Sequence, residues 1–208
     1  MVTTPEDSAP AAPAADHVED ASEQESAAPL ARPRLLWVTI AVAIGVIVVD
    51  QITKAIVLAT LQPRIAAGEG PIEVIGSFLK LTFVQNTGAG FGIGSNFTWV
   101  FALIAVIVAV VIIRTARKLG SVAWAVALGG LLGGALGNLV DRVIRAPGFG
   151  EAYGGPGHGY VVDFIQLPYW PVFNVADMSI VCSAILMVIL TIRGTPLTGR
   201  AAATGPDA

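Results

Sequence analysis

Four long apolar stretches constrain this chain more than any other feature of its sequence. Each approaches the roughly 20 residues that an α-helix needs to cross the ~30 Å hydrocarbon core of a bilayer. Only 13% of the 208 residues are charged, against about a quarter in soluble domains. The sequence therefore predicts an α-helical integral membrane protein with four transmembrane helices, over residues 35–61, 97–113, 121–143 and 174–192.

The two ends of the chain differ from this pattern. Residues 1–34 contain acidic residues, alanines and prolines but no aromatic residue. Such a segment buries too little apolar surface to offset its ordering entropy, so we expect a disordered tail. Residues 194–208 are expected to form a second disordered tail. Residues 35–193 then make up a single four-helix membrane domain.

Basic residues are concentrated at one end of the predicted bundle. Cytoplasmic loops of membrane proteins are enriched in Lys and Arg, and an even number of spans places both termini on the same side. We therefore expect both termini in the cytoplasm. The basic residues on that side are Arg32, Arg34, Arg114, Arg117, Lys118, Arg193 and Arg200.

The connection between the first two spans, residues 62–96, is too long for a simple turn. Within it, "IEVI" (72–75) and "LKLTFVQN" (79–86) are rich in β-branched and apolar residues, as short strands are. We expect a small extracytoplasmic β element there. The loop over residues 146–160 contains six glycines and is expected to be mobile.

Polar residues of several segments meet at the extracytoplasmic end of this topology. Ionisable residues at membrane depth are functional candidates by default. A purely structural explanation exists for several of them. Asp50 and Lys54 are spaced i,i+4 and can pair on one helical face. The glycines of residues 130–137 allow close helix packing, and Asn174 can cap a helix whose dipole favours Asp177.

Asp163 is harder to explain structurally, because it lies in the apolar stretch "GYVVDFI" away from any predicted helix start. With Asp177 it suggests a carboxylate pair. Two close carboxyl groups share one proton near neutral pH, so one can act as general base on water while the other donates to a carbonyl.

Other catalytic schemes lack the residues that they require. No zinc-binding His motif, Gly-x-Ser-x-Gly motif or Cys–His pair is visible, and Cys182 is the single cysteine. We therefore expect neither a metal nor a cofactor. An ion or proton-coupled transporter also uses intramembrane acids, although no inverted repeat is visible. A membrane scaffold whose polar cluster fixes helix packing is the third possibility. The residues alone leave all three open.

Five motifs, in order along residues 35–192, give the chain a family resemblance. They are "DQITK" (50–54), "QNTGAGFGI" (85–93), "GGALGNLVDRV" (133–143), "GYVVDFI" (159–165) and "PVFNVAD" (171–177). The chain resembles the lipoprotein signal peptidase (signal peptidase II) family of bacterial membrane aspartyl proteases. The resemblance implies cleavage of diacylglyceryl-modified prolipoproteins just before the lipidated cysteine.

The resemblance also implies roles for particular residues. Asp163 and Asp177 match the catalytic aspartates of the family. The matched positions that bind substrate or support the site are Asp50, Lys54, Asn86, Gly88, Asn138, Asp141, Arg142 and Asn174.

Partners and location follow from the same resemblance. They are lipid-modified prolipoproteins and membrane lipids, with no nucleic acid, for a monomer in the bacterial cytoplasmic membrane whose active site lies near the extracytoplasmic face. Two features depart from the family pattern, namely the longer loop at 146–160 and the acidic extension over residues 1–34.

Overall fold

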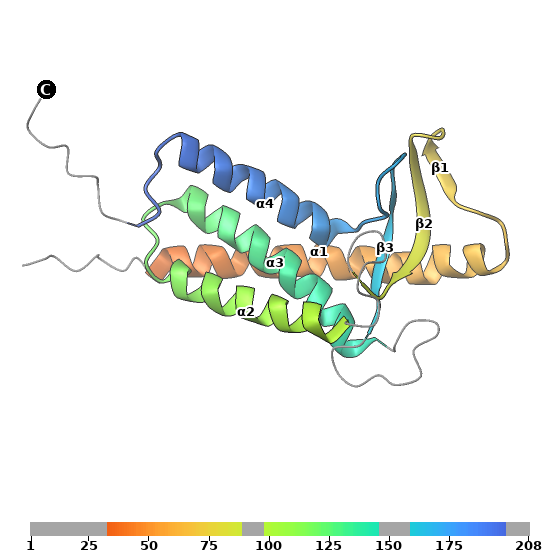
Figure 1. The fold of residues 1–208 in the computed structure, drawn as a ribbon, viewed down its shortest axis with the longest axis horizontal. Helices are drawn as coiled ribbons and strands as arrows, with labels where there is room; N and C mark the ends of the chain where they lie inside the picture. The colour runs from red at the N-terminus through yellow and green to blue at the C-terminus, as the bar shows by residue number, and fades with distance from the viewer. Residues whose placement is uncertain (1–32, 89–97, 146–158, 199–208) are drawn as a thin grey trace, which may run out of the picture.

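The computed structural model describes residues 33–88, 98–145 and 159–198. In these ranges four helices are long and apolar enough to cross a membrane. They lie side by side, with a small sheet at one end of the bundle (Figure 1). The predicted fold class is confirmed. In chain order the elements are α1 (Pro33–Ala66), β1 (Ile72–Ile75), β2 (Leu79–Asn86), α2 (Thr98–Ala116), α3 (Val122–Ile144), β3 (Val161–Gln166) and α4 (Val175–Ile192).

The first helix extends further than its apolar stretch predicts. It continues through Pro63 to Ala66, and its last turns project past the sheet (Figure 1). Apolar length measures how much of a helix crosses hydrocarbon, so it gives no signal for turns beyond the bilayer. These extra turns place α1 beside the strands.

Helix α3 is the centre of the bundle, and its glycines allow that position. A Cβ on Gly133 would lie 2.7 Å from the carbonyl oxygen of Ala43 in α1, and one on Gly134 would lie 2.5 Å from that of Ala176 in α4. Because no real side chain tolerates such distances, both neighbours pack directly on the α3 backbone. The packing role predicted for these glycines is confirmed.

At the end of the bundle away from the sheet, part of the expected C-terminal tail packs against the helices. The indole N–H of Trp124 donates to the carbonyl of Thr195 at 2.9 Å, and the N–H of Gly120 donates to that of Leu197 at 3.0 Å. The remainder of that tail, the expected N-terminal tail and all but the last two residues of the loop at 146–160 lie outside the described residues.

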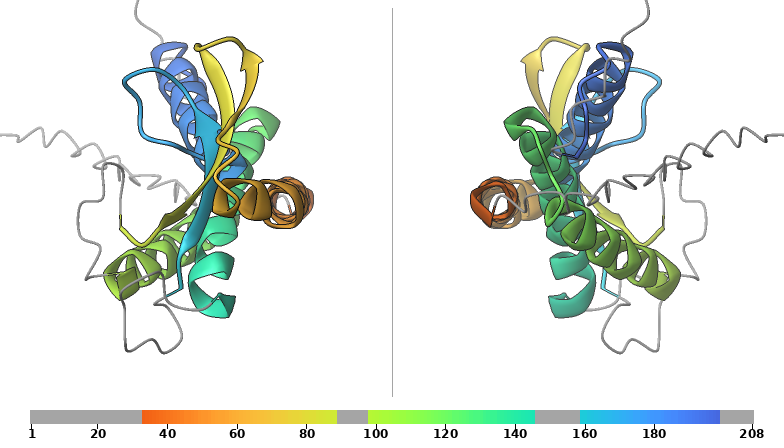
Figure 2. Two further views of the ribbon diagram at one scale, coloured as in Figure 1. Left: turned by 90° about the vertical axis from the view of Figure 1, so that its right-hand side faces the viewer. Right: turned by 90° about the vertical axis from the view of Figure 1, so that its left-hand side faces the viewer.

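The sheet has the order β1-β2-β3 with antiparallel pairing throughout. Strands β1 and β2 match the predicted segments, whereas the third strand, β3, was not predicted. Its first four residues are all buried, so it lacks the polar–apolar alternation by which a half-buried strand is recognised. Figure 2 (left) shows the strands crossing in front of the helix ends. The sheet thereby brings Asp163 of β3 against the bundle.

Candidate active site

Lys54 is the centre of a buried charge network. Its ammonium lies 2.8 Å from Asp50 and 2.9 Å from Asp141, and it donates a 3.0 Å hydrogen bond to Asn138. An ammonium has three N–H donors, so all of them are used. The predicted Asp50–Lys54 pair is present, and Asp141 of α3 joins it. Lys54 therefore forms ion pairs with two fully buried carboxylates.

The second oxygen of Asp50 holds the beginning of α4. It accepts a 2.9 Å hydrogen bond from the backbone N–H of Ala176. Ala176 immediately precedes Asp177, so the charge network of α1 fixes the backbone next to one carboxyl group of the candidate pair.

Asp141 holds the backbone of β3 in the same way as Asp50 holds that of α4. Its Oδ2 accepts a 3.2 Å hydrogen bond from the backbone N–H of Val162, the residue before Asp163. Its Oδ1 accepts from Gln51 at 3.2 Å and from Arg145 at 2.9 Å. Asp50 and Asp141 thus fix the two segments that carry the candidate pair.

Asp163 and Asp177 are held by amides. Asn174 donates to Asp163 at 2.6 Å and to Asn138 at 3.1 Å, and Asn138 donates to Asp177 at 2.8 Å. Asn86 of β2 donates to the other oxygen of Asp163 at 2.7 Å. The two carboxyl groups are therefore connected through a chain of two side-chain amides.

The capping role considered for Asn174 and Asp177 is also present. Asn174 accepts from the N–H of Asp177 at 3.0 Å, and Oδ2 of Asp177 accepts from the N–H of Asn174 at 3.1 Å. This reciprocal capping box fixes the side chain of Asp177. Its Oδ1 is the oxygen that contacts Asn138, so capping and a place in the site are compatible.

The environment of Asp163 changes its protonation. Burial, followed by the charge of Asp177, raises the pKa of the Asp163 carboxyl to about 7. Hydrogen bonds from Asn86 and Asn174 and the charge of Lys54 act in the opposite direction. Near neutral pH this carboxyl can therefore both hold and release a proton.

Arg142 is buried on α3 beside the pair. It donates to the carbonyl oxygens of Gly88 at 3.1 Å and Asn138 at 3.3 Å, and its guanidinium carbon lies 5.6 Å from the centre of the Phe101 ring. Its Nε finds no hydrogen-bond partner in the described part of the chain. A buried donor without a partner is costly, so this N–H can take a further hydrogen-bond acceptor.

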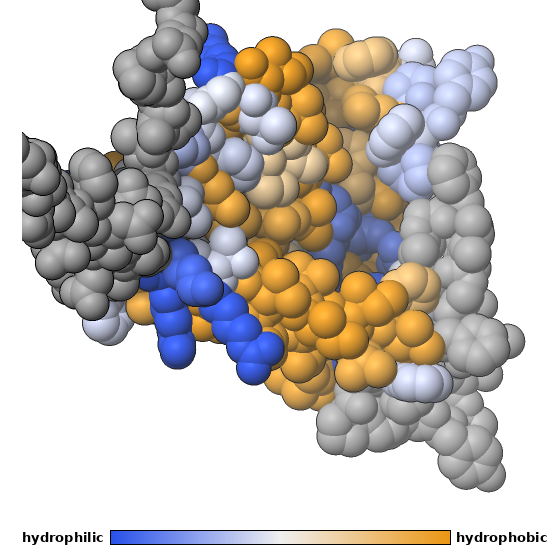
Figure 3. Space-filling view, turned by 60° about the vertical axis from the view of Figure 1, so that its left-hand side comes forward, coloured by the Kyte–Doolittle hydropathy of each residue, from blue (hydrophilic) through white to orange (hydrophobic). Residues whose placement is uncertain are grey.

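Part of this network lines a cavity of about 470 Å³ between the sheet and the bundle. Both carboxyl groups, Arg142 and residues 170–173 contribute to its wall. A second cavity of about 240 Å³ lies between α2 and α3 and is lined mainly by their apolar residues. It extends to Asn138 and Arg142. Figure 3 shows a mostly hydrophobic flank with hydrophilic side chains at the bottom of a hollow.

All ten residues selected from the sequence lie in this network or line its cavity. Sequence reasoning missed Gln51, Arg145 and Phe101. Gln51 stands inside the "DQITK" motif, and Arg145 is spaced i,i+4 from Asp141, which could have indicated it. Phe101 carries no signal within its apolar stretch. No group of three or more His, Cys, Asp or Glu side chains suited to a metal ion occurs within residues 33–88, 98–145 and 159–198.

Comparison with solved structures defines the class of protein. Two bacterial membrane enzymes solved by the in meso method, at 2.3 and 1.9 Å resolution, are each 32% identical to this chain, with TM-scores of 0.61 and 0.59. The alignments cover 76% of this chain and 88% and 94% of those chains. The fold is that of a bacterial membrane enzyme.

Comparison of sequences defines the family. The family model described as signal peptidase (SPase) II matches residues 42–193. A lipoprotein signal peptidase of Mycobacterium avium is 46% identical over 170 residues, covering 81% of this chain and 87% of the relative. One of Mycolicibacterium smegmatis is 44% identical over 191 residues, covering 92% and 74%. The chain belongs to the signal peptidase II family of aspartic peptidases, which favours the peptidase interpretation over a transporter.

Proposed function

We propose that this protein removes the signal peptide from diacylglyceryl-modified prolipoproteins by hydrolysing the peptide bond before the lipidated cysteine. One observation carries the proposal beyond family membership. Asp163 and Asp177, from a strand and a helix, line one cavity and are connected through the amides of Asn174 and Asn138. This arrangement suits a pair of carboxyl groups that act on one bond.

The charge balance of the site supports a pair that shares one proton. Four carboxyl groups and three cations make up the cluster at this end of the bundle, so it carries one negative charge when every group is ionised. A single proton on the carboxyl pair makes the whole cluster neutral, and a poorly solvated site favours a neutral cluster. The groups are Asp50, Asp141, Asp163 and Asp177 with Lys54, Arg142 and Arg145.

The reaction then follows general acid–base catalysis. The ionised carboxylate takes a proton from water as the water oxygen attacks the scissile carbonyl carbon. The protonated carboxyl gives its proton to the carbonyl oxygen, forming a neutral tetrahedral intermediate. When the intermediate collapses, its hydroxyl proton returns to one carboxylate and the C–N bond breaks. The departing amine takes the proton from the other carboxyl, so the pair again holds one proton.

The other residues of the site bind the substrate or position the carboxyl pair. We assign Arg142 to the substrate carbonyl, because its Nε is buried without a partner in the described residues. Asn86, Asn138 and Asn174 orient the carboxyl pair, and the carbonyl of Gly88 holds Arg142. Asp50, Lys54 and Asp141 position the start of α4 and strand β3, which carry the pair.

The location of the site fits a lipid-anchored substrate. Acyl chains in the outer leaflet deliver the scissile bond at the bilayer boundary, and the hydrophobic cavity between the helices offers an approach from the lipid. The helix ends opposite the sheet carry Arg34, Arg114, Arg117, Lys118 and Arg193, and no acidic residue of the described ranges accompanies them. By the positive-inside rule we infer that the site lies at the extracytoplasmic face of the cytoplasmic membrane, with both termini inside. One chain supplies every group named here, so we expect a monomer.

A cleavage assay tests the proposal. Purified protein is incubated with a diacylglyceryl-modified prolipoprotein or its unlipidated form, and the products are separated on a gel. We expect cleavage of the lipidated form only, and a loss of at least about 1000-fold in Asp163→Asn and Asp177→Asn. Equal cleavage of the unlipidated form would contradict the substrate class, and near-wild-type rates in both variants would contradict the carboxyl pair.

A further inference from the structure

The central strand of the sheet has a partly open edge. On one side β3 pairs with β2 from Lys80 to Asn86. On the other side β1 pairs only with Leu79, Lys80 and Leu81. Residues 82–86 of β2 therefore have one edge that no other described strand covers. Such an edge offers backbone N–H and C=O groups to an incoming extended chain.

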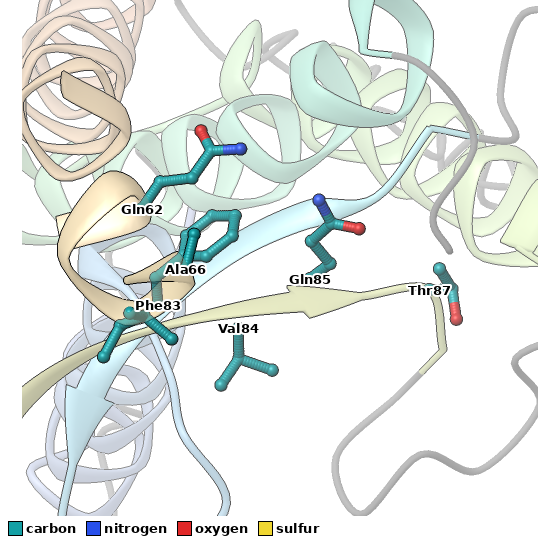
Figure 4. A pocket seen from close by; sticks show the side chains of 7 residues that line it. Gln62, Ala66, Phe83, Val84, Gln85 and Thr87 are labelled. Atoms are coloured by element: carbon teal, nitrogen blue, oxygen red, sulfur yellow. The ribbon is translucent and has the colours of Figure 1, made fainter. Parts of the chain in front are cut away.

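A groove of about 450 Å³ runs along this edge. Its other wall is the last two turns of α1. Figure 4 shows Val84 and Gln85 pointing to opposite sides of β2, yet both line the groove. Side chains of consecutive strand residues occupy opposite faces. Phe83 and Gln85 share the face of β2 that packs on α1, so the groove covers that face and reaches the strand edge at Val84. Its lining residues are Gln62, Ile65, Ala66, Phe83, Val84, Gln85 and Thr87.

The open edge of β2 begins close to the carboxyl pair. Val84 is in register with Asp163, and Asn86 donates to Asp163 at 2.7 Å. Neighbouring strands lie about 4.8 Å apart, and an extended chain advances about 3.4 Å per residue. A peptide that leaves the scissile bond therefore reaches the open edge of β2 within about two or three residues.

We propose that this groove binds the segment of the substrate that follows the lipidated cysteine, as an extended strand added to the open edge of β2. The inference rests on the proposed function. Backbone pairing of this kind holds a peptide largely independently of its sequence, while the side chains of Gln62 and Gln85 offer further hydrogen bonds.

The position of the groove and its two side-chain amides favour this segment over the signal peptide. The groove lies at the outer turns of α1, beyond the stretch that crosses the hydrocarbon, and two amides line it. An apolar signal segment remains in the bilayer, where the helices offer a hydrophobic cavity. The chain beyond the cysteine continues into water at the sheet end of the bundle, where the groove lies.

Filling the groove tests the proposal. Ala66→Trp places a bulky side chain in the groove, and Ala67→Trp is the matched control, since exposed Ala67 does not line it. Two lipid-modified substrates are compared, one extending eight residues beyond the cysteine and one ending a single residue beyond it. We expect Ala66→Trp to raise KM about tenfold for the long substrate only, and Ala67→Trp to change neither. A KM that is unchanged, or raised equally for both substrates, would overturn the proposal.

A second measurement examines the backbone directly. A strand exchanges hydrogen bonds with a given neighbour only through alternate residues. Two long substrates are N-methylated at the second and fourth, or at the third and fifth, residues beyond the cysteine. We expect one set to lose about tenfold in kcat/KM and the other to be cleaved normally. Identical behaviour of the two sets contradicts strand addition.

The wild-type enzyme separates the two levels of inference. If it cleaves neither the long nor the short lipidated substrate, the proposed function itself fails. If it cleaves both with the same KM, the function stands and the groove proposal fails.

Discussion

Two pairs of aspartates lie at the sheet end of the bundle, and their partners differ. Asp50 and Asp141 contact the ammonium of Lys54 at 2.8 and 2.9 Å. Asp163 and Asp177 contact side-chain amides instead, with no Lys or Arg within ion-pair distance in the described residues. The contacting group, not the residue type, separates the two pairs.

The difference assigns each pair a task. A carboxylate in contact with a buried cation is held in place and can accept fixed hydrogen bonds. Asp50 and Asp141 use theirs to hold the N–H groups of Ala176 and Val162. A carboxyl group surrounded by amides and close to a second carboxyl keeps its proton more readily, so the other pair is suited to proton transfer.

Removing the cation should produce the largest loss of stability. Lys54→Met leaves Asp50 and Asp141 buried without their shared partner, which typically costs about 3–5 kcal/mol. We expect a strongly lowered midpoint of thermal unfolding in detergent. Adding Asp50→Asn and Asp141→Asn to this variant should recover part of the loss. An unchanged midpoint in Lys54→Met would mean that the network does not hold the fold.

Disturbing the contact between α3 and α4 should have the next largest effect. Gly134→Ala places a methyl group 2.5 Å from the carbonyl oxygen of Ala176, so the start of α4 must shift together with Asp177. Overpacking of this kind costs about 1–3 kcal/mol, and we expect reduced turnover as well. Gly45→Ala is the control, since nothing lies within 4 Å of its added methyl, and both its stability and its turnover should be retained.

The smallest expected effect concerns the pH profile. Ionising Asp163, whose pKa is raised to about 7, removes the last proton of the pair, so kcat/KM should fall up to tenfold per pH unit above about pH 7. The hydrogen bond from Asn86 lowers this pKa. Asn86→Ala should therefore move the falling limb to higher pH, by less than about one unit. A shift to lower pH would contradict the assigned contact.

Much of this arrangement could be predicted from the sequence, because it depends on long apolar stretches and short-range spacing. The four helices, the first two strands, the Asp50–Lys54 pair and the cap formed by Asn174 are all of this kind. The third strand was missed because burial on both faces removes the alternation of residues 161–166.

The joining of Asp141 to Lys54 and the open edge of β2 were also missed. Both depend on how distant segments pack, and neither leaves a local pattern. Family resemblance selected residues that the fold brings together in one network. Only the fold distinguishes those that contact a cation from those that contact amides.

The most direct test measures turnover and stability together in four variants: Asp50→Asn, Asp141→Asn, Asp163→Asn and Asp177→Asn. Above pH 7 the buried charge of Asp163 destabilises the fold, since its folded pKa of about 7 lies above the ordinary value of 3.8. At pH 8 Asp163→Asn should therefore keep or raise the unfolding midpoint. We predict that Asp163→Asn and Asp177→Asn abolish cleavage of a lipidated prolipoprotein while remaining folded, and that Asp50→Asn and Asp141→Asn lower the midpoint. Full stability with no turnover in Asp50→Asn or Asp141→Asn, together with retained turnover in Asp163→Asn, would contradict this division between the two pairs.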